Sequence, residues 1–244
     1  METLELVRTV SPPIATLGSK FYFDPATLAR GKEAGLDGFR LYMLGRGGVL
    51  GDVEPAVVHS AFGYFKPELI AKMWNSARET MAPREAGRLY MECAGAFGSS
   101  KLGGVEGLDE FAAAADKVID AALVDSAAQA LFAGIASEPR SDEPAARAYQ
   151  SVVVLRELRG SLHLVALVAS GLSTEMAHRV RRPTELELFG WTSEVEVTDA
   201  HRTKWEAAEM LTDELTAAVY DVLDDAEAQA FAHGVATIEA ALAD

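Results

Sequence analysis

Residues 151–170 read SVVVLRELRGSLHLVALVAS, which is apolar over most of its length. The opening VVVL is also compatible with a strand. The apolar residues that follow recur three or four positions apart, at Leu155, Leu158, Leu162 and Val165. This spacing places them on one face of a helix, so we expect a single long helix over about 145–170 that ends at Gly171.

Helix signals recur along the rest of the chain. Asp24, Asp37 and Ser173 are suited to cap a helix N-terminus, and Pro12 with Pro13 is expected to end the first helix. The expected helices cover 2–10, 25–35, 38–45, 55–64, 67–75, 84–97, 108–124, 125–136, 174–182, 199–223 and 225–242. The glycine-rich segments 45–51 and 98–107 are expected to be a turn and a loop. Only 185–189 and 194–198 alternate as strands do, which predicts a mainly α protein.

The segment SEPRSDEP at 137–144 has two prolines, four charged residues and no aliphatic residue, which is typical of a boundary. It divides the chain into an N-terminal helical half, 1–140, and a C-terminal helical half, 141–244. A weak echo of Gly–Leu turns suggests that the halves are related. The long C-terminal helices are expected to pack against each other or against a second subunit, which makes a homodimer the expected state.

The composition bounds the compartment and the partners. The net charge is −15, and in 192–244 only Arg202 and Lys204 offset thirteen acidic residues. This acidity argues against nucleic-acid binding. The chain has no apolar run of membrane-spanning length and no signal-peptide pattern, and its single cysteine, Cys93, forms no internal disulfide. We therefore expect a cytoplasmic protein that binds neither nucleic acid nor membrane.

Short motifs along most of the chain resemble those of an actinobacterial family of helix-turn-helix proteins with no assigned biochemical role. They are GLDGF at 35–39, RGGVLG at 46–51, FGYF at 62–65, Trp74, His163, GLS at 171–173, His178, FGWT at 189–192 and LTDEL at 211–215. The resemblance implies helix-turn-helix-like cores in both halves, with a degenerate winged-helix-like arrangement in the second.

The sequence departs from that family after the FGWT motif. Only SEVEV, residues 193–197, separates Thr192 from Thr198. A recognition helix needs about three turns to reach bases in the major groove. Five residues with two glutamates are too short for that role, so the sequence predicts that this half has lost a DNA reader.

Known catalytic and metal-binding motifs are missing from the sequence. The glycines of 45–51 lack the preceding strand and the Lys-Ser/Thr pair of a phosphate-binding loop. None of the five histidines has metal-ligand spacing, so no metal site is expected, and Cys93 is interpreted as a packed thiol.

His163 is a polar residue within the apolar stretch LHLVALV, and Arg159 precedes it by one turn. It is either a hydrogen-bonded core residue or a pocket residue that acts as a donor, a general base or an axial haem ligand. His178 follows the Gly171 turn and could reach the same cavity. No cofactor is assigned, and haem is one alternative.

Aromatic and basic residues gather in one short window of the N-terminal half. They are Tyr22, Arg40, Tyr42, Arg46, Phe62, Tyr64 and Phe65. Either they fill the core, or they wall an apolar pocket in which Arg46 or Arg40 meets a carboxylate or phenolate. Trp191 of the FGWT motif is assigned to the same pocket.

Three function classes remain open. The leading hypothesis is a protein that binds an apolar or aromatic small molecule between its helical halves. The second is an enzyme of specialised metabolism that uses the same pocket, with His163 as its acid–base group. The third, a transcription regulator, rests on the family resemblance alone.

Overall fold

The structure is a computed structural model that describes residues 2–243. Within this range the chain forms twelve α-helices, three short 3₁₀ helices and no strand, so the expected mainly α class is confirmed. The elements are α1 (Thr3–Leu17), η1 (Lys20–Phe23), α2 (Pro25–Glu33), α3 (Gly38–Gly47), η2 (Gly48–Leu50), α4 (Pro55–Phe62), α5 (Pro67–Arg78), α6 (Pro83–Leu102), α7 (Leu108–Val124), α8 (Ala130–Ala136), α9 (Pro144–Ala169), α10 (Thr174–Arg181), η3 (Leu186–Phe189), α11 (Asp199–Tyr220) and α12 (Asp225–Ala241).

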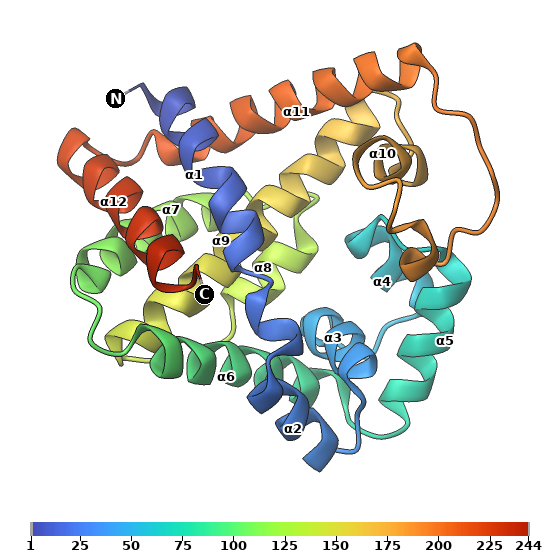
Figure 1. Cartoon of the computed structure of the whole chain (residues 1–244), viewed down its shortest axis with the longest axis horizontal. Helices are drawn as coiled ribbons and strands as arrows, with labels where there is room; N and C mark the ends of the chain where they lie inside the picture. Colours follow the sequence, from blue (N-terminus) through green and yellow to red (C-terminus); the bar gives the residue numbers. More distant parts are fainter. Residues whose placement is uncertain (1, 244) are drawn as a thin grey trace.

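The central element is α9, the long helix expected from the apolar stretch. It packs against α1, α6, α7, α8 and α11, which surround it in Figure 1. The helices at the two ends of the chain, α1 and α12, also contact each other. The main hydrophobic core accordingly runs from Leu6 to Leu242 and takes residues from both sides of 137–144. The division into two related halves stays a prediction.

A second, smaller hydrophobic cluster lies at the C-terminal end of α9. Ala166 and Leu167 meet Ala177 of α10 and Ala208 of α11, and the partly buried Trp205 packs against them. The chain therefore has two clusters of apolar side chains along one helix, and the space between them is where a cavity forms.

The predicted helix starts are confirmed at the residues that cap them. The side chain of Asp24 accepts a hydrogen bond from the backbone N–H of Ala26, and that of Asp37 accepts one from Arg40. The hydroxyl of Ser173 likewise accepts from Met176 at 3.2 Å. These contacts satisfy backbone donors that have no partner inside the helix.

The expected end of the first helix was wrong. Pro12 and Pro13 lie inside α1, which continues to Leu17. Proline removes hydrogen bonds in a helix interior. Here Ile14 and Leu17 are each 2% exposed in the main core, and their burial stabilises the extra turns.

Helical structure extends into both glycine-rich segments where a turn and a loop were expected, although the loop expected over 98–107 is confirmed for residues 103–107. Helix α3 runs to Gly47 and is followed by η2, while α6 runs to Leu102. Glycine at 48 and at 98 allows two backbones to approach: an added Cβ would lie 1.9 Å from the Pro83 carbonyl oxygen and 2.5 Å from that of Ala145, respectively. Close packing of helices, rather than chain reversal, explains these glycines.

The two alternating segments are not strands. Residues 186–189 form η3, and 194–198 have no regular secondary structure. The C-terminal helices α11 and α12 pack mainly against α1, α7 and α9 of the same chain. No helix within residues 2–243 has the length and hydropathy that a membrane span requires.

Candidate functional site

A cavity of about 200 Å³ lies between the two hydrophobic clusters. Its walls come from α1, α3, α4, α8, α9, α10 and α11, together with η3. An engineered apolar cavity of about 150 Å³ is large enough to bind benzene. The space therefore suits a molecule with a single aromatic ring and a substituent.

Aromatic side chains form most of the apolar wall: Tyr42, Phe62, Tyr64, Phe65, Phe189 and Trp205. The Phe65 ring stacks on that of Phe189 with centroids 4.3 Å apart, which joins the N-terminal segment to η3. The ring of His163 lies between Tyr64, at 6.4 Å, and Trp205, at 5.2 Å. Flat rings around a small space favour a flat apolar ligand.

A buried ion cluster closes the α1 end of the cavity. The guanidinium of Arg46 donates two hydrogen bonds to the carboxylate of Glu157, at 2.9 and 2.7 Å. Arg156 donates to the same carboxylate at 2.8 Å and to the backbone oxygen of Ala15 at 3.2 Å. Although burial alone would raise it, the pKa of Glu157 lies below its ordinary value because of the two arginines. One carboxylate is thus shared by two cations.

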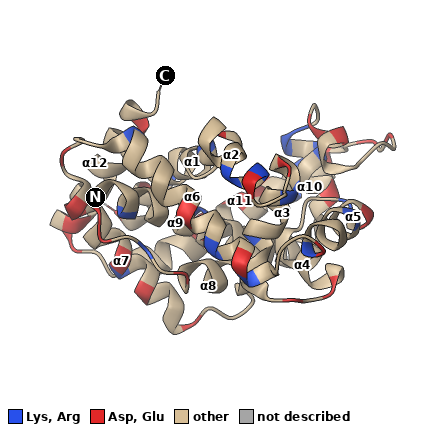
Figure 2. Ribbon diagram, turned by 90° about the horizontal axis from the view of Figure 1, so that it is seen from below, with Lys and Arg blue, Asp and Glu red and all other residues tan. Residues whose placement is uncertain are grey.

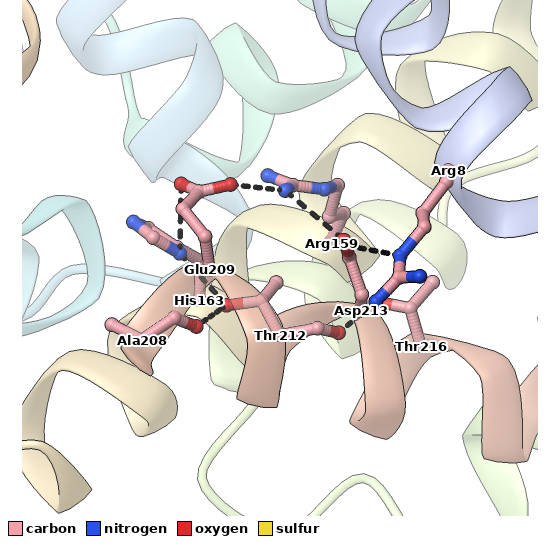
Figure 3. Close-up of polar contacts among 8 residues, drawn as sticks. All are labelled: Arg8, Arg159, His163, Ala208, Glu209, Thr212, Asp213 and Thr216. Atoms are coloured by element: carbon pink, nitrogen blue, oxygen red, sulfur yellow. Dashed lines mark hydrogen bonds and ion pairs between the residues drawn. The ribbon is translucent and has the colours of Figure 1, made fainter. Parts of the chain in front are cut away.

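His163 occupies the other end, on the α9 face that contacts α11. Its Nδ1 lies 2.8 Å from the hydroxyl of Thr212, which in turn donates its proton to the backbone oxygen of Ala208 at 2.6 Å (Figure 3). A hydroxyl has one proton to donate, so Thr212 must accept from His163, and Nδ1 carries the ring proton. The remaining nitrogen, Nε2, is then an acceptor on a residue that lines the cavity.

The His163 ring is neutral at pH 7. Burial lowers its pKa to about 4, and the nearby Arg159 and Arg181 act in the same direction, while Glu209 opposes them. A base with this pKa is weak at neutral pH, because efficient general bases have a pKa near the working pH. The ring is therefore better suited to accept a hydrogen bond than to move a proton.

A network of ion pairs links this end of the cavity to α1. Arg159 donates to Glu209 at 2.9 Å and lies 3.6 Å from Asp213, which also contacts Arg8 (Figure 3). Six side-chain N or O atoms among the described residues are buried without a hydrogen-bond partner, and two of them belong to residues that line the cavity: Nε of Arg159 and Nε2 of His178. Unpartnered buried polar atoms are rare in native proteins and indicate a missing partner such as a ligand or water.

His178 is 3% exposed and packs between Phe189, at 4.1 Å between ring centroids, and Tyr64, at 5.9 Å. Burial lowers its pKa, and the adjacent Arg182 adds to the effect. With Arg179 and Arg181, Arg182 gives the end of α10 a basic stretch (Figure 2).

The cavity brings together eight of the residues that the sequence offered as pocket residues: Tyr42, Arg46, Phe62, Tyr64, Phe65, Arg159, His163 and His178. In contrast, Tyr22 lies in the core behind Arg156, whose guanidinium is 5.4 Å from its ring. Arg40 forms an ion pair with Asp37, the N-cap residue of α3, and donates a hydrogen bond to Ser76 on α5; it does not line the cavity.

Trp191 does not line the cavity, although it holds a segment that does. Its Nε1 donates to the backbone oxygen of Tyr64 at 2.8 Å, and Lys66 donates from its backbone to Phe189 at the same distance. Both bonds attach η3 and the following turn to the α4–α5 connection. Trp191 thus positions Phe189 rather than contacting the cavity.

Several residues that line the cavity were not predicted from the sequence, among them Arg156, Glu157, Gly160, Trp205 and Glu209. A signal was present for the first three, because two charges and a glycine interrupt an apolar helix. For Trp205 and Glu209 the sequence held no comparable signal, since they reach the cavity only through the packing of α11 on α9.

Within the described residues, no three side chains of His, Cys, Asp or Glu are grouped to hold a metal ion. Pockets for drug-sized ligands measure about 300–1,000 Å³, so a cavity of about 200 Å³ does not fit a haem, which is larger than such ligands.

Cys93 is buried, and burial raises the pKa of its thiol.

A family model described as a helix-turn-helix family matches residues 7–187, which include most of the cavity wall. No curated protein and no solved structure shows significant similarity to the chain. Because the match covers well over half of the sequence, the chain belongs to this helix-turn-helix family.

Proposed function

We propose that this protein binds a small aromatic molecule in the cavity between its two hydrophobic clusters. The observation that carries the proposal is an aromatic-lined cavity whose lining residues include two buried polar atoms without a hydrogen-bond partner in the protein, Nε2 of His178 and Nε of Arg159. Leaving a buried polar group unpaired costs about 1–3 kcal/mol, which a bound ligand would recover.

Gly160 supports the same proposal. It lies in the middle of the α9 stripe that faces the cavity, and a Cβ added there would meet no atom within 4 Å. Glycine in a helix interior is destabilising by roughly 0.5–1 kcal/mol relative to alanine. A glycine that no neighbouring atom requires is explained if the space beside it is needed for a ligand.

An enzyme that uses His163 is the second candidate, because the ring borders the cavity. Its pKa of about 4 favours binding over acid–base catalysis at neutral pH. Turnover would therefore depend on a ligand that raises this pKa.

For a transcription regulator the supporting observation is family membership. We keep the sequence-based proposal that nucleic acid is not a partner, since residues 193–197 form no helix and the net charge is −15. Saturable tight binding of duplex DNA in an electrophoretic shift at low salt would favour a transcription regulator over a small-molecule-binding protein. The cytoplasmic location and the homodimer remain proposals, and the latter is tested by mass measurement in solution.

The direct test is titration calorimetry with phenol, indole, benzoate and 4-hydroxybenzoate on the full chain. We expect at least one compound to bind with a Kd below about 1 mM, an affinity of roughly 4 kcal/mol. Amide chemical shifts should change in α9 and α10. A matched variant, Gly160→Leu, puts a side chain into the cavity and should abolish binding. If no compound binds, or if Gly160→Leu binds as well as the native chain, the proposal is wrong.

A further inference from the structure

The wall of the cavity at its α1 end has one positive charge more than it has negative charges. Arg46 and Arg156 share the carboxylate of Glu157, and no second acid contacts either guanidinium among the described residues. The side chains of Arg46, Arg156 and Glu157 are 10%, 24% and 1% exposed, so most of this cluster is shielded from solvent. Water therefore screens this excess charge poorly.

Neighbouring phenols do not supply the missing negative charge. The ring of Tyr22 packs on Arg156, but burial raises the pKa of its hydroxyl to about 12. Tyr90 lies beside Tyr22, and burial raises its pKa as well. Both phenols are neutral at pH 7. A buried cation without a counter-ion is unfavourable, so an anion from outside the chain is the natural partner.

The opposite end of the cavity offers a hydrogen-bond acceptor. His163 follows Arg156 by seven residues on α9, about 10 Å along the helix axis. Because Nδ1 donates to Thr212, Nε2 carries a free lone pair on a residue that lines the cavity. A ligand that spans the cavity would present an anionic group at one end and a donor, such as a phenolic hydroxyl, at the other.

The arginines of α10 are less suited to hold the anion. Arg181 and Arg182 are exposed to solvent, and Arg182 already pairs with Glu185 at 3.0 Å. Solvent screens such charges, so they gain little from a counter-ion.

We infer that the ligand is a small aromatic carboxylate whose carboxylate lies beside Arg156 and Arg46 and whose distal hydroxyl donates to His163. This inference rests on the proposed function and adds the charge of the ligand and its orientation. Arginine binds carboxylates through paired, charge-assisted hydrogen bonds, which suits this choice over a neutral polar group.

The test compares 4-hydroxybenzoate with 4-hydroxybenzamide, which has the same shape but no charge. Calorimetry on the full chain should show the carboxylate binding at least about tenfold more tightly, as expected for a charge-assisted contact. In Arg156→Gln the ratio should fall below about threefold while the amide binds as before, which also shows that the variant is folded. The control is Arg147→Gln, an ion-paired arginine of the same helix outside the cavity, which should keep the native ratio.

The outcomes separate the two proposals. Equal binding of carboxylate and amide would overturn the inference and leave the proposed function standing. A preference that survives in Arg156→Gln but disappears in Arg181→Gln would place the anion at the wrong end, and would also overturn it. If neither compound nor any other in the panel binds, both proposals fail. The contact of the distal hydroxyl is tested with His163→Phe, which should bind 4-hydroxybenzoate more weakly than the native chain but bind benzoate with the same affinity.

Discussion

Substitution of Gly160 tests whether the cavity is open space, because filling open space beside a helix glycine should increase the stability of the protein. It is the only glycine of α9, and a Cβ at this position would meet nothing within 4 Å. In Gly160→Ala the added methyl group therefore encounters no clash. The substitution also restricts the unfolded chain, which stabilises the folded state.

The expected magnitude follows from helix energetics. Replacing a helix-interior glycine with alanine is worth roughly 0.5–1 kcal/mol. For a chain of this size 1 kcal/mol shifts the Tm by about 2–4 °C, so Gly160→Ala should raise it by about 1–4 °C. Gly160→Leu should stabilise by at least as much, because each further CH₂ buried in the cavity adds up to about 0.8 kcal/mol.

The assay is thermal and urea unfolding of both variants beside a matched control. Gly98→Ala introduces the same methyl group into a helix, but there a Cβ would lie 2.5 Å from the Ala145 carbonyl oxygen. Overpacking of this kind costs about 1–3 kcal/mol, so the control should be destabilised. Opposite signs at the two glycines would distinguish empty space from tight packing.

One result would refute the reasoning: a loss of more than about 1 kcal/mol in Gly160→Ala, larger than any gain from helix propensity. The side chain would then be meeting atoms, and the cavity would not be open at this point. A gain in stability together with unchanged ligand binding in Gly160→Leu would instead separate the open space from the binding site.

Three further predictions concern the buried polar groups. Glu157→Gln leaves two arginines without a carboxylate and should destabilise the protein by about 3–5 kcal/mol in urea unfolding; a loss below 1 kcal/mol would contradict the buried pairing. His163 has a pKa of about 4 in the folded protein and an ordinary pKa of 6.5, so between these pH values the unfolded chain binds more protons than the folded one. The free energy of unfolding should therefore fall by up to ~3 kcal/mol as the pH drops from 6.5 to 4. The His163→Phe variant should lack this part of the pH dependence. An NMR titration of the native protein that finds a pKa above 6 for His163 would contradict the prediction. Tyr149→Phe leaves the Leu17 carbonyl and the Phe21 N–H unpaired. Thermal unfolding should show a loss of about 1–3 kcal/mol in the free energy of unfolding, and the ligand affinity should not change.

Local patterns predicted the helices and much of the cavity wall. The spacing of Arg159 and His163, one turn apart on an apolar helix, correctly indicated a shared face, and both line the cavity. Clustering in sequence was a weaker guide: Tyr22 and Arg40 lie near Tyr42 along the chain, yet one is in the core and the other is bound to Asp37. Neighbours in sequence share a helix face only if their spacing fits its period.

Other parts of the site depend on contacts between distant segments. Arg46 was assigned to a turn, but helix α3 continues through it and directs its guanidinium to Glu157, 111 positions further along the chain. The glycines on either side indicated chain reversal, whereas Gly45 lets α3 approach Tyr90 of α6 and Gly47 lets it approach Trp74 of α5. Trp205 and Glu209 reach the cavity only because α11 crosses α9. No local pattern contains that information.

The central helix departs from the rules of a stable core within a single short segment. Arg156, Glu157, Gly160 and His163 each replace a side chain that would pack better, and a buried ion pair can often be exchanged for apolar residues without loss of stability. Such departures, when they are not compensated by packing, are expected at functional sites. Between Ala145 and Leu155 most of α9 is buried and apolar, and its polar residues there, Arg147, Gln150 and Ser151, do not line the cavity. Because the four departures named above lie together on one stripe that faces one cavity, the proposed ligand accounts for all four at once, whereas a purely structural explanation would need a separate reason for each.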